Sequence, residues 1–176
     1  MPVVELPMPV VEPPCRWSSL SRPVYSRSVS EPAASERPVL RLVDIREVPL
    51  EVSEVLAALS DTAAGGLTLF VGAVRDHDEN KGVSGLEYSA HPTALLQLQA
   101  VAEQVAKDYD VIALAAVHRT GRLALGDAAV IVATAAAHRG EAFAASRALI
   151  DELKATVPIW KHQLFADGTD EWVGTP

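Results

Sequence analysis

The distribution of proline limits where this chain can fold. Eight of its twelve prolines lie between positions 2 and 38. Proline has a fixed φ and no backbone N–H, so a segment this rich in it forms neither a helix nor a central strand. We therefore predict that residues 1–38 are a disordered or poorly ordered Pro/Ser-rich tail. Residues 39–176 are expected to form one folded domain that functions without the tail.

The composition is that of a soluble globular protein, with 49% hydrophobic and 22% charged residues. No apolar run is long enough to span a membrane, and no secretion signal is recognisable. Cys15 is the single cysteine, so neither a disulfide framework nor a cysteine-based metal site is expected. These features predict a cytoplasmic protein, and any sulfur that it handles must come from another molecule.

The acidic balance belongs to the predicted domain. Residues 1–38 carry four Arg and four Glu, whereas residues 39–176 carry 11 Lys and Arg against 19 Asp and Glu. Together they give the formal net charge of −8. An acidic domain is a poor general binder of nucleic acid, so a cluster of cations within it needs a local reason.

Hydrophobic periodicity predicts an α+β domain with a largely antiparallel sheet and about three helices. Residues 76–82 are expected to be a mobile polar loop, and residues 121–127 a turn-rich link. Thr93 is the expected N-cap of the second helix, whose inward side chains would be Leu96, Ala100, Val101 and Val105. The predicted helices are 50–59, 93–109 and 139–156, and the predicted strands are 39–48, 67–74, 83–90, 111–118, 128–137, 159–165 and 171–173.

The helix over 139–156 presents two neighbouring stripes, and Pro158 ends it. Ala142, Ala145, Leu149 and Leu153 form an apolar stripe, while Phe143, Arg147, Ile150 and Lys154 share the adjacent face. Lys154 therefore borders the core. The strand that begins at Ile159 brings Lys161 back towards the same edge. Two nearby ammonium groups favour the neutral form of one of them, and a neutral lysine can act as a nucleophile or a general base.

Each candidate also has a structural interpretation. Lys154 can complement the helix dipole, Lys161 can be an exposed strand residue, and Arg75 can be solvated beside the acidic loop. His138 can be a hydrogen-bonded histidine near a helix start. The five histidines show no metal-binding spacing, so no metal is expected. The residues alone thus predict an acidic α+β domain with a candidate anion pocket, since the guanidinium groups of Arg75 and Arg139 suit phosphate or carboxylate.

Four segments carry a resemblance to a known family: FVGAVR at 70–75, AHR at 137–139, IDELK at 150–154 and PIWKHQ at 158–163. Together with a second His-Arg pair, at 118–119, they resemble the molybdopterin synthase catalytic (large) subunit family from about Leu40 to Gly174. The resemblance implies an α/β hammerhead-type fold. It also implies a homodimer that binds a small ubiquitin-like sulfur carrier to form a heterotetramer, with no cofactor.

In that family the carrier's C-terminal Gly-Gly thiocarboxylate enters the large subunit, and sulfur passes to cyclic pyranopterin monophosphate to make molybdopterin. The resemblance implies that Lys154 and Lys161 are the catalytic lysines. At position 163 the family often has Glu, so Gln163 here puts any acid–base role at that position in doubt and leaves a hydrogen-bonding role. The substrate-binding residues that the resemblance implies are Arg75, His138, Arg139, Phe70, Ile150 and Gln163.

Two other functions compete with this sulfurtransferase. A non-catalytic module would grip the carrier's C-terminal tail without converting the pterin, and Gln163 in place of Glu favours it slightly. A structural or regulatory homologue would keep the fold with solvated lysines, and it would have no affinity for phosphate-bearing pterins.

Overall fold

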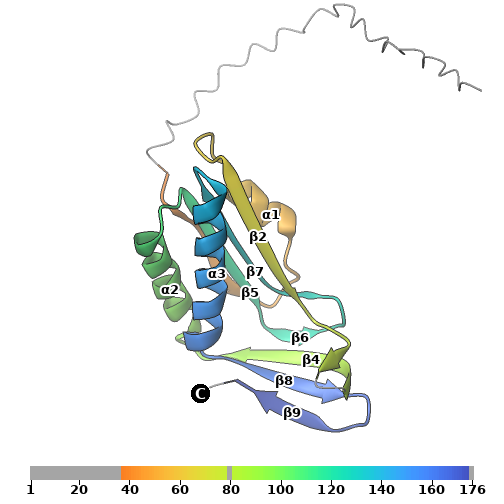
Figure 1. Ribbon diagram of the computed structural model, residues 1–176. Coiled ribbons are helices and arrows are strands. Elements are labelled where there is room, and N and C mark those ends of the chain that lie inside the picture. The colour runs from red at the N-terminus through yellow and green to blue at the C-terminus, as the bar shows by residue number, and fades with distance from the viewer. Residues whose placement is uncertain (1–36, 79–80, 175–176) are drawn as a thin grey trace, which may run out of the picture. The chain divides into compact units, whose positions relative to one another are not determined.

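The computed structural model describes residues 37–78 and 81–174. Within them the chain alternates short strands with three helices (Figure 1). The helices are α1 (Val52–Ala58), α2 (Ala94–Asp108) and α3 (Arg139–Thr156). The strands are β1 (Leu40–Arg46), β2 (Gly66–Ala73), β3 (His77–Asp78), β4 (Lys81–Ala90), β5 (Ala113–Arg119), β6 (Gly121–Leu123), β7 (Ala128–Ala136), β8 (Ile159–Phe165) and β9 (Asp170–Val173).

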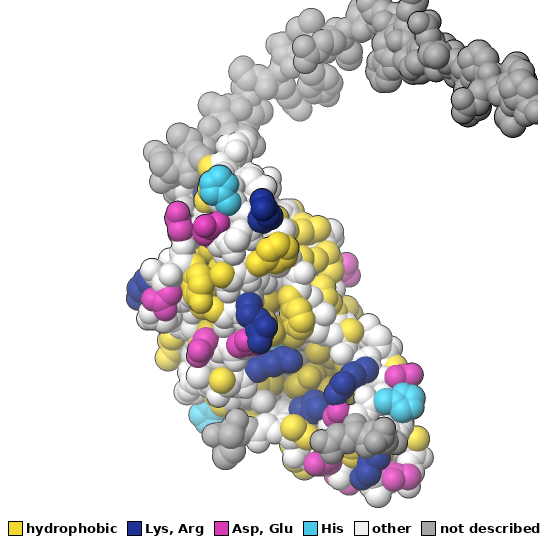
Figure 2. Space-filling model, viewed as in Figure 1, with side chains coloured by type: hydrophobic (Ala, Val, Ile, Leu, Met, Phe, Trp, Pro, Cys, Tyr) yellow, Lys and Arg dark blue, Asp and Glu magenta, His cyan; other side chains and the backbone are white. Residues whose placement is uncertain are grey.

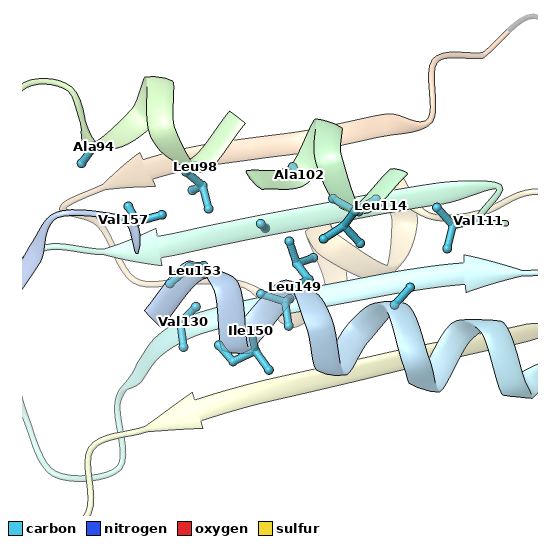
Figure 3. Packing of buried hydrophobic residues seen from close by; sticks show 14 residues of the cluster. Ala94, Leu98, Ala102, Val111, Leu114, Val130, Leu149, Ile150, Leu153 and Val157 are labelled. Atoms are coloured by element: carbon cyan, nitrogen blue, oxygen red, sulfur yellow. The ribbon is translucent and has the colours of Figure 1, made fainter. Parts of the chain in front are cut away.

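The first sheet has the strand order β1-β5-β7-β2 and carries helices on both faces. Strands β5 and β7 are almost continuously buried, as expected for strands covered on both sides. Leu114 of β5 and Val132 of β7 pack beneath α2 and α3, in the cluster that Figure 3 shows from close by. On the opposite face, Ala115 and Ile131 pack against Val55 of α1. Alternate side chains of the same strands therefore build two separate cores.

The second sheet crosses the end of the domain at which α3 finishes (Figure 1). Its order is β3-β4-β8-β9, and β6 pairs with β4. A small cluster of Val74, Leu86, Leu123 and Ala129 joins it to the first sheet. Strand β8 follows α3 directly, so the last helical turn and the second sheet meet at one corner.

The predicted α+β class is confirmed: three helices are present, and β1–β5 is the one parallel pair among the described strands. The predicted bounds of α3 and β8 are also confirmed, because Pro158 separates two strongly patterned segments. The prediction of a tail over 1–38 falls, up to residue 36, outside the described residues. No helix in the described ranges is long and apolar enough to cross a membrane.

Two local predictions were wrong, and the predicted N-cap at Thr93 was right in its position. The loop over 76–82 contains β3, which pairs with β4, and the link over 121–127 contains β6. Such two- and three-residue strands carry no periodic signal. Thr93 does occupy the N-cap of α2, but its hydroxyl makes no capping hydrogen bond and lies 2.8 Å from Nδ1 of His91 instead.

The predicted inward face of α2 was wrong in part: Val105 is buried and Val101 packs partly buried against the core, but Ala100 is exposed. Leu96 is 68% exposed, whereas Leu98 and Ala102 are fully buried. The helix has apolar side chains on more than one side, so the spacing of its own residues did not identify the face that packs. Contacts with β1 and α3 select the buried face, which consists of Ala94, Leu98, Ala102 and Val105.

Candidate functional site

Lys154 and Lys161 line one cavity of about 280 Å³ at the corner where α3 meets the second sheet. Lys154 lies in the last turn of α3, and Val157 closes the helix with its N–H bonded to the Leu153 carbonyl. The chain then enters β8, in which Lys161 pairs with Tyr88 of β4. The predicted return of Lys161 to the edge near Lys154 is therefore what the fold produces.

A shallow groove of about 410 Å³ runs between β2 and α3 and also reaches Lys154. Its walls include Phe70, Phe143 and Ile150; Phe143 is 63% exposed. Figure 2 shows this face of the molecule, on which Lys and Arg side chains alternate with hydrophobic ones. Lys154 thus lies where an apolar groove meets the cavity that also contains Lys161. This geometry suits a ligand with an extended apolar stem and an anionic end.

The carboxylate of Asp78 accepts hydrogen bonds from three side chains, one of which is Lys161. The Arg75 guanidinium bonds to Oδ1 at 2.5 Å, while Gln163 Nε2 and Lys161 Nζ bond to Oδ2 at 2.7 and 3.3 Å. These partners lower the pKa of Asp78; the Gln163 hydrogen bond is the largest cause, and burial acts in the opposite direction. Asp78 therefore holds a negative charge next to the second lysine.

Arg75 lies between the end of β2 and the start of β3, and its side chain is 75% exposed. It is paired with Asp78 of the acidic segment, yet most of the guanidinium stays accessible. The sequence offered two interpretations of Arg75, an anion-binding guanidinium and a solvated arginine beside the acidic loop, and each describes part of its environment. It remains a predicted anion-binding residue.

His118 is a cavity residue that the sequence did not single out. It is 5% exposed, its Nδ1 lies 2.8 Å from the Arg119 carbonyl, and its ring meets Tyr88 edge-on at 4.9 Å. Burial lowers the pKa of His118 to about 4, helped by the nearby charge of Lys154 and opposed by the bond to the carbonyl. The imidazole is therefore neutral at physiological pH. Its Nδ1–H donates the hydrogen bond to the Arg119 carbonyl, so Nδ1 is the nitrogen that carries the proton.

The only signal for His118 was the first His-Arg pair, at 118–119. Its place at the end of a buried strand turns the imidazole towards the lysines. Tyr88, which comes from β4, lines the same cavity, and burial raises the pKa of its phenol. Sequence patterns could not reveal Tyr88, because no motif surrounds it.

His138 and Arg139 lie at the other end of α3. His138 is the N-cap and Arg139 is the first helical residue, and both are exposed. Fifteen residues separate Arg139 from Lys154, which amounts to about 22 Å along a helix. One copy of the chain therefore does not bring the His-Arg pair to the lysine cavity. Within the described ranges no group of three or more His, Cys, Asp and Glu side chains is arranged to hold a metal ion.

Comparison with known proteins gives consistent matches. The family model described as "MoaE protein" matches residues 45–156, a range that includes Arg75 and Lys154 and ends before Lys161. Molybdopterin synthase catalytic subunit 1 of Mycobacterium tuberculosis (strain ATCC 25618 / H37Rv) is 44% identical over 138 residues. That alignment covers 78% of this chain and 91% of the relative.

Two solved structures share the fold. The crystal structure of molybdopterin synthase from Staphylococcus aureus superposes with a TM-score of 0.70 at 28% identity, over 74% of this chain and 96% of that one. A chain in the complex of subunits 1 and 2 of molybdopterin-converting factor from Helicobacter pylori 26695 superposes with a TM-score of 0.57 at 22% identity. It covers 78% of this chain and 90% of that one, and at this identity the likeness concerns the fold alone.

Proposed function

This chain belongs to the MoaE family of molybdopterin synthase catalytic subunits, and we propose that Lys154 and Lys161 carry its reaction. The enzyme is a sulfurtransferase of molybdenum cofactor biosynthesis. It moves sulfur from a thiocarboxylated carrier protein to cyclic pyranopterin monophosphate, and two transfers complete the dithiolene of molybdopterin. The observation that carries the proposal is the convergence of the two lysines on one cavity that adjoins an apolar groove.

The groove suits the extended C-terminus of a small ubiquitin-like carrier. A Gly-Gly end has no side chains, so its backbone can lie close against the shallow groove lined by Phe70, Phe143 and Ile150. Strand β2 is the last strand of its sheet, and its outer edge offers backbone groups to an extended tail. A tail that follows the groove brings its thiocarboxylate to Lys154, whose ammonium complements the negative charge.

Lys161 and the neighbouring cations serve the phosphorylated pterin. Lys161 and Arg75 are held by one carboxylate, so their positions beside the cavity are coupled. The side chain of Lys161 is 24% exposed and that of Arg75 is 75% exposed, so water screens the charge of Lys161 less and this lysine stabilises developing negative charge more strongly. We assign Lys154 to the carrier's reactive end and Lys161, with Arg75, to the substrate anion.

His138 and Arg139 can reach such a cavity only from a second copy of the chain, given their place on α3. The proposal therefore includes a homodimer, with one carrier on each catalytic subunit in a heterotetramer. It also includes a cytoplasmic location, since Cys15 is the only cysteine and the sulfur must arrive on a partner.

The test is turnover of cyclic pyranopterin monophosphate by the full chain with a separately prepared, thiocarboxylated carrier. Lys154→Ala is expected to lower product formation roughly 100-fold or more, because a charge at the reacting group is lost. Lys107→Ala is the matched control: Lys107 is also an exposed lysine in the last turn of a helix, α2, but it lines neither the lysine cavity nor the groove.

Circular dichroism and carrier binding are measured on the same variants. Near-normal turnover by Lys154→Ala would contradict the assignment. Carrier binding by the wild-type chain without any pterin conversion would instead support the non-catalytic binding module.

A further inference from the structure

The carboxylate of Asp78 lines a cavity of about 190 Å³ next to the lysine cavity, and it has a defined place there beside Lys161. Asp78 reaches it from β3, the short strand that forms a hairpin with β4, and Asp78 pairs there with Lys81. Its side chain is 20% exposed, and that of Lys161 is 24% exposed. A carboxylate that is this enclosed interacts more strongly with a lysine than a surface carboxylate does.

Gln163 determines how that carboxylate is held. The residue is 3% exposed, and its amide nitrogen donates to Asp78 Oδ2 at 2.7 Å. The reverse orientation would place the amide oxygen against the carboxylate, so the hydrogen bond fixes which atom faces Asp78. Among the described residues the buried Oε1 of Gln163 has no partner, which is unfavourable for a buried acceptor. Within the described part of the chain, the bond to Asp78 is therefore the hydrogen bond that the Gln163 side chain makes.

A glutamate at position 163 is incompatible with this arrangement while Asp78 is ionised. Its carboxylate would lie at hydrogen-bond distance from that of Asp78, and two carboxylates so close cannot both keep their charge without strong repulsion. An amide at one position and a carboxylate at the other place a single negative charge beside Lys161. The identities of residues 78 and 163 are therefore linked.

We propose that Asp78 is the positioning residue for Lys161, and that Gln163 is the amide partner that lets a single carboxylate at position 78 do this. The inference rests on the proposed role of Lys161 in catalysis. Asp78 does not touch the substrate; it acts through the lysine. The other charged groups near the Asp78 carboxylate are Arg75, which donates to Oδ1, and Lys81 and Glu171, which line the same cavity as Asp78.

The experiment compares Asp78→Asn, Gln163→Glu and the double variant in the full chain. Asp78→Asn removes the charge and Gln163→Glu adds a second one, so each is expected to lower kcat about 10-fold. The apparent KM for the carrier should stay within about 2-fold, because the groove at Phe70 and Phe143 is unchanged. In the double variant the carboxylate and the amide exchange places, and kcat should return to within about 3-fold of wild type.

Asp76→Asn is the matched control. Asp76 lies in the same segment and is exposed, and its side chain pairs with His77. This variant is expected to keep wild-type kcat. Wild-type activity in Asp78→Asn, or a double variant no better than the worse single variant, would overturn the proposal.

A second measurement does not depend on turnover. Competitive acetylation of the purified chain, followed by mass spectrometry of the peptide with Lys161, reports how reactive that amine is. Asp78→Asn should raise the rate several-fold, because the ammonium loses its counter-ion, while the double variant and Asp76→Asn should match wild type. If wild type makes no product, the proposed function fails, yet the acetylation rates still decide about Asp78: an unchanged rate in Asp78→Asn overturns its role.

Discussion

At the scale of single residues, His118 shows how burial sets the chemistry of the cavity. The same residue type at position 138 is exposed at a helix start, whereas His118 is enclosed by Tyr88 and bonded to a backbone carbonyl. Removal from water disfavours the imidazolium, and the charge of Lys154 adds to that effect. A neutral imidazole next to two lysines does not add to their repulsion, which favours keeping both lysines in one cavity.

The lowered pKa of His118 predicts a pH dependence of stability. The folded state binds the proton with a pKa of about 4, against an ordinary pKa of 6.5 for the unfolded chain. Between these values the unfolded chain binds more protons, so the contribution of this group is complete above pH 6.5 and is lost as the pH falls towards 4. Between pH 7 and pH 5 the loss from this group is about 2 kcal/mol.

Urea unfolding at a series of pH values checks this, with His118→Gln as the comparison. The variant lacks the titrating group, so its free energy of unfolding should fall less steeply between pH 7 and pH 5 than that of wild type. Equal slopes would show that His118 does not titrate as its burial predicts.

At the scale of elements, the junction between β7 and α3 depends on the close approach of β2. The Gly65 N–H bonds to the Ala136 carbonyl, and a Cβ on Gly65 would lie 2.3 Å from the Ala137 carbonyl oxygen. Glycine therefore allows β2 to begin directly beside the start of α3. That start fixes where the other end of the helix delivers Lys154.

Two glycine substitutions test the junction. Gly65→Ala should lower the free energy of unfolding by about 1–3 kcal/mol, because the backbone must move to relieve the clash. Gly140→Ala, in the first turn of α3, adds a methyl group that would meet no neighbouring atom within 4 Å, so it should be neutral or stabilising by up to about 1 kcal/mol. Chemical denaturation of both variants gives the comparison. Similar values for the two would mean that the approach of β2 is not tight.

At the scale of the whole molecule, an acidic chain contains a local group of cations at its predicted site. Arg75, Lys154 and Lys161 lie around one corner, and Asp78 offsets part of their charge. The net charge of −8 keeps non-specific anions such as nucleic acid away, while the corner attracts a small phosphorylated ligand or a carboxylate end. Selectivity of this kind comes from placing cations together rather than from their number.

Removal of residues 1–36 tests the predicted domain boundary. The hydrophobic clusters of the described residues begin at Val39, so the shortened chain should keep kcat within about 2-fold and its thermal midpoint within about 2 °C. Turnover and thermal unfolding of the two chains provide the check. A large loss of either would show that the proline-rich segment contributes to the domain or to its active assembly.

The sequence by itself determined the α+β class, the full extent of α3 and β8, and the return of Lys161 towards Lys154. These follow from strong periodicity and from a proline that cannot continue a helix. Only the tertiary structure decided which face of α2 is buried, where the short strands β3 and β6 pair, and that Asp78 and His118 border the lysines. It also placed His138 and Arg139 about 22 Å from Lys154 along α3. Such facts depend on contacts between segments far apart in the chain, and local spacing carries no information about those contacts.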